Sequence, residues 1–311
     1  MREDETSSEF KIKDAASYNS LTAEFDRFAQ RLSLAFAEHL VRLANLKSSD
    51  WVLDVGTGTG IVALLAARRI GSAGKVIGVD LSDGMLFAAK SKAVQDGLEN
   101  RIQFCRLDAE ALALRDASFD VVLSLFALLH FPNPLVALME MFRVLRPGGR
   151  LVLAVGSSPS LLSSAGLAEG LRHMQRRFAV RQGKLLIGPH SLDDFVTQRI
   201  PGSKEAEEAP IARESKNRSH KIPQLIRQAQ FTNFRRRWCG TEAFFETPEE
   251  FWEIQRTFSS IARKRLSGIS PEKIEELRQE FLENCREVQS RGGRLVYPFG
   301  ALFAVAQRPR T

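Results

Sequence analysis

The chain has 311 residues, of which 44% are hydrophobic and 26% are charged, an ordinary composition for a soluble globular protein. No apolar stretch is long enough to cross a bilayer, no secretory signal peptide opens the sequence, and three scattered cysteines predict neither a disulfide framework nor a zinc site, so we expect a cytoplasmic protein. The net charge of +7 permits an acidic partner such as nucleic acid, but the basic residues are dispersed and favour a solvated basic surface.

Apolar residues recur at steps of three and four between Leu21 and Leu46. This spacing predicts an amphipathic helix, either continuous or broken once. Because the helix precedes the first strand, we expect it to lie over the sheet or over the mouth of a ligand site.

A buried strand, a glycine-rich loop and a helix come next. The apolar run Trp51–Val55 predicts the strand, Gly56, Gly58 and Gly60 alternate with threonines, and a helical pattern begins at Ile61. This order is the first half of a nucleotide-binding βαβ unit, in which glycine lets the loop turn tightly and the backbone approach a ligand. A dinucleotide fingerprint would place a glycine or alanine where Ile61 stands, so the spacing argues against a nicotinamide cofactor.

Strands and helices then alternate up to residue 155. Lys75–Asp80 predicts the second strand, which ends on a carboxylate able to accept hydrogen bonds from two adjacent ribose hydroxyls. The patterns from Arg101, Ser118 and Arg150 predict the third, fourth and fifth strands. Asp108 follows the third strand at its carboxyl end, where open α/β sheets bind ligands.

The rest of the chain departs from this alternation. Residues 156–220 form a long insertion with a basic helical segment, Leu167–Phe178. A helix and a sixth strand are expected over residues 221–238. A capping box and a second Ser-Pro start predict two helices over residues 247–292, and a short buried strand is expected at Ala301–Gln307.

Five motifs occur in order over residues 50–155: D-V-G-T-G-T-G, V-I-G-V-D-L-S, L-D-A-E-A-L, S-F-D-V-V-L-S and R-V-L-R-P-G-G-R-L. Together they resemble the core of the class I S-adenosylmethionine (SAM)-dependent methyltransferases, near the subgroup that includes ubiquinone and menaquinone biosynthesis enzymes. The resemblance implies SAM as cofactor and a doubly wound, Rossmann-like α/β sheet of seven strands. In that fold the last strand is antiparallel and inserts beside strand five.

The resemblance also implies which residues contact the cofactor. They are Gly56, Thr57 and Gly58 at the methionine moiety, Asp80 at the ribose, Leu81 against the adenine, Asp108 near the adenine amino group, Ala109 beside the ring, and Ser124 and Leu125 near the reactive methyl.

The expected organisation has four segments. Residues 1–48 form an N-terminal helical cover and residues 49–155 the SAM-binding core. Residues 156–220 are an inserted helical and loop segment, longer than the family's usual connection, and its role stays open. Residues 221–311 complete the sheet and carry a helical lid at 247–292.

Methyl transfer from SAM is a direct displacement, so the protein's main tasks are to align the acceptor and to exclude water. The sequence assigns no catalytic residue. His130, after the fourth strand, is the best-placed base, but the alternative is that it packs under the loop, since L-L-H-F-P is a frequent family pattern. No cluster of His, Cys and Asp has metal-ligand spacing, so no metal is expected.

The expected function is methyl transfer to a small, largely apolar organic molecule. The chain has 21 phenylalanines and only two tyrosines. Phenylalanines in segments expected around the acceptor are Phe25, Phe28, Phe126, Phe131, Phe244, Phe245, Phe251 and Phe258; the alternative is that they are core residues.

Two other functions stay open, a nucleic-acid methyltransferase and a non-catalytic SAM-binding regulatory protein. The sequence S-L-F-A from Ser124 differs from the motif of enzymes that methylate exocyclic base nitrogens, which argues against nucleic acid. Neither the acceptor atom nor the oligomeric state follows from the sequence.

Overall fold

The computed structural model describes residues 11, 15–16, 18–19, 21–157, 164–182, 185–187, 190–200 and 219–310. The chain divides into two compact units. The first unit contains Met1–Gly156, Asn217–Arg237 and Ala301–Thr311, and the second unit contains Ser157–Lys216 and Trp238–Gly300.

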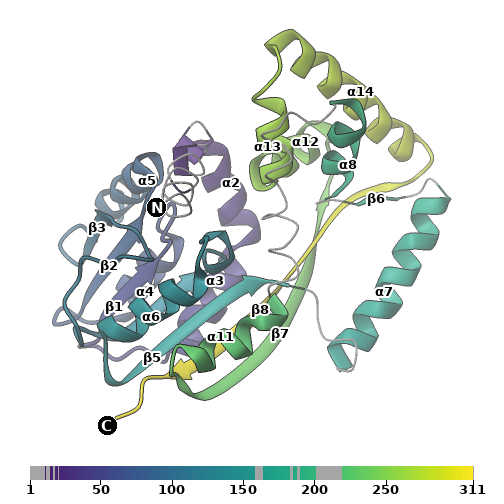
Figure 1. Ribbon diagram of the computed structural model, residues 1–311. Helices are drawn as coiled ribbons and strands as arrows, with labels where there is room; N and C mark the ends of the chain where they lie inside the picture. The colour runs from purple at the N-terminus through teal and green to yellow at the C-terminus, as the bar shows by residue number, and fades with distance from the viewer. Residues whose placement is uncertain are drawn as a thin grey trace, which may run out of the picture. The chain divides into compact units, whose positions relative to one another are not determined.

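A mostly parallel sheet forms the centre of the first unit (Figure 1). Its strands are β1 (Trp51–Val55), β2 (Lys75–Asp80), β3 (Ile102–Arg106), β4 (Phe119–Leu125), β5 (Leu145–Gly156) and the end of β8 (Arg294–Gln307). The order is β3-β2-β1-β4-β5-β8, and β8 runs antiparallel to β5, with Arg150 opposite Gln307. Since β2 and β3 lie on one side of β1 and β4 on the other, the strand order reverses at β1. That reversal is where open α/β sheets bind ligands, at the carboxyl ends of the strands.

Helices cover both faces of this sheet. They are α2 (Thr22–Leu32), α3 (Leu34–Ala44), α4 (Ile61–Arg69), α5 (Asp83–Gln95), the 3-10 helix η1 (Leu128–His130), α6 (Pro134–Val144) and α11 (Ile222–Gln228). On one face α6 and α11 pack over the strands, while α3 and α4 pack together on the other.

The sequence of helix α6 explains why it forms here and packs against the sheet. Asn133 is its N-cap and Pro134 occupies the first turn, where the missing proline N–H removes no hydrogen bond. Leu138 and Met141 lie on one face and are fully buried. Each contributes about 1.5–3 kcal/mol by leaving water. The helix ends at Val144, where the next residue takes an extended conformation.

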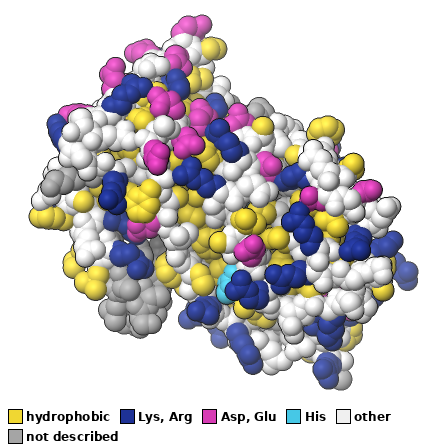
Figure 2. Space-filling view, turned by 180° about the vertical axis from the view of Figure 1, so that it is seen from behind, with side chains coloured by type: hydrophobic (Ala, Val, Ile, Leu, Met, Phe, Trp, Pro, Cys, Tyr) yellow, Lys and Arg dark blue, Asp and Glu magenta, His cyan; other side chains and the backbone are white. Residues whose placement is uncertain are grey.

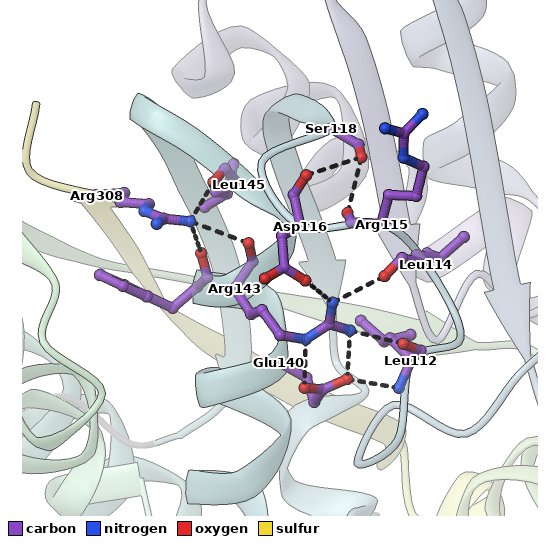
Figure 3. Close-up of polar contacts among 10 residues, drawn as sticks. Leu112, Leu114, Arg115, Asp116, Ser118, Glu140, Arg143, Leu145 and Arg308 are labelled. Atoms are coloured by element: carbon purple, nitrogen blue, oxygen red, sulfur yellow. Dashed lines mark hydrogen bonds and ion pairs between the residues drawn. The ribbon is translucent and has the colours of Figure 1, made fainter.

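Two arginines fix the C-terminal end of α6 (Figure 3). The Arg143 guanidinium donates to Glu140 (2.8 Å), to Asp116 (2.5 Å) and to the carbonyl oxygens of Leu112 (2.6 Å) and Leu114 (2.8 Å), which ties the loop after β3 to the helix. The Arg143 hydrogen bonds hold the pKa of Glu140 below its usual value.

Arg308 donates to the carbonyls of Phe142 (3.0 Å), Arg143 (2.9 Å) and Leu145 (2.6 Å). These are carbonyls that a helix end leaves without intrahelical partners.

The second unit is mainly helical. Its elements are α7 (Ser164–Arg181), β6 (Leu185–Ile187), α8 (His190–Arg199), α12 (Pro248–Phe258), α13 (Ser260–Leu266), α14 (Pro271–Ser290) and parts of β7 (Thr232–Phe245) and β8. Phe281 lies at its centre, with ring centroids 5.3 Å from Phe195 and 5.5 Å from Trp252. The Gln255 side-chain oxygen accepts from the Leu192 N–H at 3.1 Å, so α8 and α12 belong to one core.

The predicted α/β fold class is confirmed, including the antiparallel last strand beside β5. The N-terminal helix is broken once, at Ser33, and both predicted caps at Thr247 and Ser270 accept backbone N–H groups. Among the described residues the sheet has eight strands, one more than the seven expected. Strand β7 pairs with β8, and the additional short strand β6 pairs with the first residues of β8.

The inserted segment and the expected lid share the second unit, since α8 of the former packs with α12 and α14 of the latter. Among the described residues, every helix is too short or too polar to cross a membrane. The division into four segments stays a prediction.

Candidate functional site

The glycine loop after β1 has a backbone that other residues adopt only under strain. Gly56, Gly58 and Gly60 have φ angles of +71°, +53° and +85°. A Cβ atom on Gly56 would lie 2.2 Å from Cβ of Ala127. The N–H groups of Gly56 and Thr57 both donate to the Val79 carbonyl at 2.9 Å, which fixes the loop to β2.

Asp54, directly before this loop, is a buried carboxyl group that the sequence analysis did not count as a site residue. Its side chain is 1% exposed, and the Thr57 hydroxyl donates to Oδ2 at 2.7 Å. Its Oδ1 atom accepts no hydrogen bond from the described residues. Burial raises the pKa of Asp54 to about 7, against the opposing effect of the Thr57 hydrogen bond. The sequence signal was a single acid within an otherwise apolar strand.

Asp80, at the end of β2, is held by two backbone donors. Its Oδ2 accepts from the Gly58 N–H at 2.9 Å and its Oδ1 from the Ser82 N–H at 3.0 Å. A carboxylate has about four acceptor positions, so about two stay open for ligand hydroxyls. Burial raises the pKa of Asp80, while the backbone donors and the charge of His130 oppose that rise. His130 is exposed on η1, and its charge acts on Asp80.

Asp108, after β3, is paired with a lysine from the N-terminal segment. The Lys11 ammonium lies 2.8 Å from Asp108 Oδ2 and 2.7 Å from a Glu110 oxygen. Burial lowers the pKa of Lys11, but its hydrogen bonds to the two carboxylates outweigh burial, so the pKa is raised overall. Ala109 is buried beside this pair. Lys11 could not be predicted as a partner of Asp108, because nothing in the sequence links residues 97 positions apart.

The N-terminal segment touches the site at two further positions. Asn19 Oδ1 accepts from the Ser82 hydroxyl at 2.7 Å, next to Asp80. Asp26 of α2 accepts from the Thr59 hydroxyl of the glycine loop at 2.6 Å and forms an ion pair with Lys92 of α5. Both side chains were missed from sequence, and each ties the segment to a loop at the strand ends.

The predicted cofactor residues lie at the carboxyl ends of four neighbouring parallel strands. Gly56, Thr57 and Gly58 follow β1, Asp80 and Leu81 end or follow β2, Asp108 and Ala109 follow β3, and Ser124 and Leu125 end β4. Ser124 is fully buried, and its hydroxyl has no hydrogen-bond partner among the described residues. Leu125 is partly buried and precedes Phe126, which has a φ of +60°.

The eight phenylalanines differ in burial, and Phe244 is 48% exposed. Phe28, Phe245 and Phe251 are buried within their own units. In the first unit, Phe25 and Phe131 are partly exposed beside the glycine loop, each with a ring carbon 3.8 Å from the position of a Cβ on Gly58 or Gly56. Among the residues the structure describes, no group of three His, Cys, Asp or Glu side chains is arranged to hold a metal ion.

The donors and acceptors at these strand ends suit an adenosine-type ligand. Asp80 keeps acceptor positions for hydroxyls, and Gly58 has no Cβ between the loop backbone and Phe25. Asp108 also keeps acceptor capacity, although the Lys11 ammonium shares its Oδ2.

Comparison with known proteins points to the same region. Residues 53–153 match the family model of the methyltransferase domain. The ubiquinone/menaquinone biosynthesis C-methyltransferase UbiE of Marinomonas sp. is 32% identical over 154 residues, covering 48% of this chain and 61% of the relative. The demethylmenaquinone methyltransferase of Lactococcus lactis is 36% identical over 149 residues, covering 46% of this chain and 58% of that protein. The chain thus spans less than two thirds of the length of these relatives.

Solved structures share the fold at low sequence identity. A putative methyltransferase from Bacillus halodurans superposes with a TM-score of 0.53 at 21% identity, covering 88% of this chain and 98% of its own. The [4+2]-cyclase SpnF has a TM-score of 0.57 at 17% identity, covering 97% of both chains. The matched residues 53–153 contain the glycine loop and strands β2, β3 and β4, so the match to the methyltransferase domain lies in the first unit.

Proposed function

We propose that this chain transfers a methyl group from SAM to a small, largely apolar organic acceptor. The observation that carries the proposal is the Asp80 carboxylate, which Gly58 and Ser82 orient beside the glycine loop while leaving acceptor positions open. Two neighbouring ribose hydroxyls match that arrangement, because each carboxylate oxygen can accept a further charge-assisted hydrogen bond. The matched methyltransferase domain supports the same conclusion.

In this proposal the predicted residues have separate tasks. Gly56, Thr57 and Gly58 receive the methionine part along the loop backbone, and Asp80 holds the ribose. Leu81 and Ala109 lie against the adenine, with Asp108 accepting from its amino group. Ser124 and Leu125 end β4 on the side of the reactive methyl.

Bound SAM supplies a methyl group on a positively charged sulfur, open to direct displacement by the acceptor. The chain's residues orient the two reactants and exclude water, which supplies most of the rate enhancement in such a transfer. His130 is the candidate base for acceptors that lose a proton, since it is exposed on η1, directly after β4.

Partly exposed phenylalanines support an apolar acceptor. Phe25 and Phe131 lie beside the glycine loop, and Phe126 packs against Phe36 with ring centroids 5.6 Å apart. Aromatic rings with few polar groups are the usual lining of a small-molecule site. The names of the relatives, which act in quinone biosynthesis, agree with an apolar acceptor.

The proposal includes a cytoplasmic location and no nucleic-acid partner. All three cysteines carry free thiols, which persist in a reducing compartment. On the face that Figure 2 shows, most Lys and Arg side chains lie in the lower right part, separated by polar and hydrophobic ones, and the acidic side chains lie mainly at the upper left. The separation of the basic side chains suits a solvated surface better than a nucleic-acid track.

The first experiment measures cofactor binding by calorimetric titration with SAM, S-adenosylhomocysteine and NAD. We expect the first two to bind. Asp80→Asn should weaken SAM binding about tenfold or more, because hydrogen bonds to a charged group contribute about 1.5–3 kcal/mol each. Asp83→Asn is the matched control, since that carboxylate is 69% exposed and lies three residues away. Equal SAM affinity in wild type and Asp80→Asn would place the ribose elsewhere.

The second experiment tests catalysis, since the same fold also occurs in a [4+2]-cyclase. The protein is incubated with methyl-labelled SAM and a metabolite extract, and labelled products are identified by mass spectrometry. We expect label in a small apolar compound. SAM binding without any labelled product would favour a non-catalytic or non-methylating role, and label in RNA would favour the nucleic-acid alternative.

A further inference from the structure

Helix α7 carries an apolar stripe that the proposed function does not use. Leu171, Met174 and Phe178 are 60%, 63% and 65% exposed. Their spacing of three and four residues places them on one face of the helix. A single exposed apolar residue is ordinary, but a contiguous apolar face usually marks an interaction surface.

The other side of α7 is attached to its own unit. Arg176 forms an ion pair with Glu242 of β7, and the side chains of the pair are only 12% and 28% exposed. At about 100° per residue, Arg176 lies about 160–200° around the helix from Met174 and Phe178. The ion pair therefore turns the stripe away from β7, in agreement with the exposures.

The charges of α7 are strongly biased. Its sequence has four arginines and one glutamate, which gives a net charge of +3 (Figure 1 shows the helix in teal). Arg181 follows Phe178 by three residues, so it lies along one edge of the stripe. An apolar stripe with basic residues along its edge is typical of helices that lie in the interface of an anionic bilayer.

A second copy of this chain fits the same face poorly. Two α7 helices packed through their stripes would bring like charges of +3 together. An anionic lipid surface instead offers both a phosphate layer for the arginines and an apolar boundary for the three side chains.

We propose that α7 binds the surface of membranes containing anionic phospholipids. The helix lies parallel to the surface, with Leu171, Met174 and Phe178 in the boundary between headgroups and acyl chains. Arg181 lies against the phosphates. This contact is independent of methyl transfer.

Flotation with lipid vesicles tests the proposal on the full chain. We expect binding to vesicles of phosphatidylglycerol and phosphatidylcholine, weaker binding to phosphatidylcholine alone, and loss of binding as salt rises. Phe178→Asp and, separately, Met174→Asp should each weaken binding about tenfold or more, since each removes an apolar side chain that the bilayer would bury. The charge variant Arg181→Gln should weaken binding to the anionic vesicles severalfold.

Phe87→Asp is the matched control, because Phe87 is 73% exposed on α5, outside the stripe. We expect it to bind vesicles like the wild type, and circular dichroism should show equal helix content in all variants. Wild-type binding that is equal with and without phosphatidylglycerol, or unchanged by Phe178→Asp, overturns the proposal. A wild-type dimer that Phe178→Asp converts to a monomer in sedimentation equilibrium overturns it in favour of a second copy.

Discussion

Replacing Asp54 by asparagine should change how stability depends on pH. Burial raises the pKa of this carboxyl from 3.8 to about 7 in the folded chain. As pH rises, the unfolded chain loses the proton first, near pH 4, while the folded chain keeps it up to about pH 7. The stabilisation is therefore complete below the unfolded pKa and is lost as pH rises through the folded pKa.

The expected magnitude follows from the size of the shift. A gap of about three pKa units corresponds to about 4 kcal/mol, of which about 3 kcal/mol falls between about pH 5 and pH 8. Asparagine does not titrate, so the free energy of unfolding of Asp54→Asn should not fall in this way as pH rises. Its oxygen still accepts from Thr57, but its amide N–H group replaces Oδ1, which has no described partner. That exchange costs about 1–3 kcal/mol at every pH.

Urea unfolding followed by circular dichroism between about pH 5 and pH 8 measures the effect. We expect the free energy of unfolding of the wild type to fall, relative to Asp54→Asn, by about 3 kcal/mol over this range. Asp83→Asn, at an exposed carboxylate, should follow the wild type. Parallel pH curves for the wild type and Asp54→Asn would refute the reasoning that the carboxyl is protonated in the fold.

Three further changes test other features. Gly56→Ala should lower the free energy of unfolding by about 2 kcal/mol or more, because the backbone is left-handed there and the new Cβ would clash with Ala127. Gly97→Ala should cost only about 1–2 kcal/mol, because Gly97 has a φ of +65° but open space around it. Equal urea midpoints for the two variants would contradict this. Arg143→Ala should cost about 2–3 kcal/mol by leaving carbonyls and Glu140 without their donor, while Arg115→Ala should be near neutral in the same assay (Figure 3). Lys11→Ala should tighten SAM binding severalfold in calorimetry, because it frees the Asp108 carboxylate for the adenine amino group. Weaker SAM binding by this variant would instead make Lys11 part of the site.

Local signals in the sequence were sufficient for the sheet of the first unit. The bounds of β1, β2 and α4 agree with the apolar runs at Trp51–Val55, Lys75–Asp80 and Ile61–Arg69, because each element is defined by its own residues. The positive φ angles of the loop glycines follow from the same local pattern. The strand ends that carry Asp80 and Asp108 could be predicted for the same reason.

Features that depend on distant residues could not be predicted. The ion pair of Lys11 with Asp108 and the hydrogen bond of Asp26 with Thr59 join segments that have no sequence relation. The sequence predicted two helices over residues 247–292, whereas the structure has three, α12, α13 and α14. Their packing against α8 could not be predicted, because an apolar face does not identify its partner. The buried Gln255, bonded to Leu192, fixes that contact only in the folded chain.

The pairing of β5 with β8 has a consequence for synthesis of the chain. Leu151, Val152 and Leu153 of β5 are fully buried, yet their partners in the sheet are Ala306, Val305 and Ala304, about half the chain away. A growing chain exposes the β5 edge, with unpaired N–H and C=O groups and apolar side chains, until these last residues leave the ribosome. The inserted unit has time to fold first. A nascent chain that stalls before Ala301 leaves this edge open, and edge-to-edge association is then its expected route to aggregation.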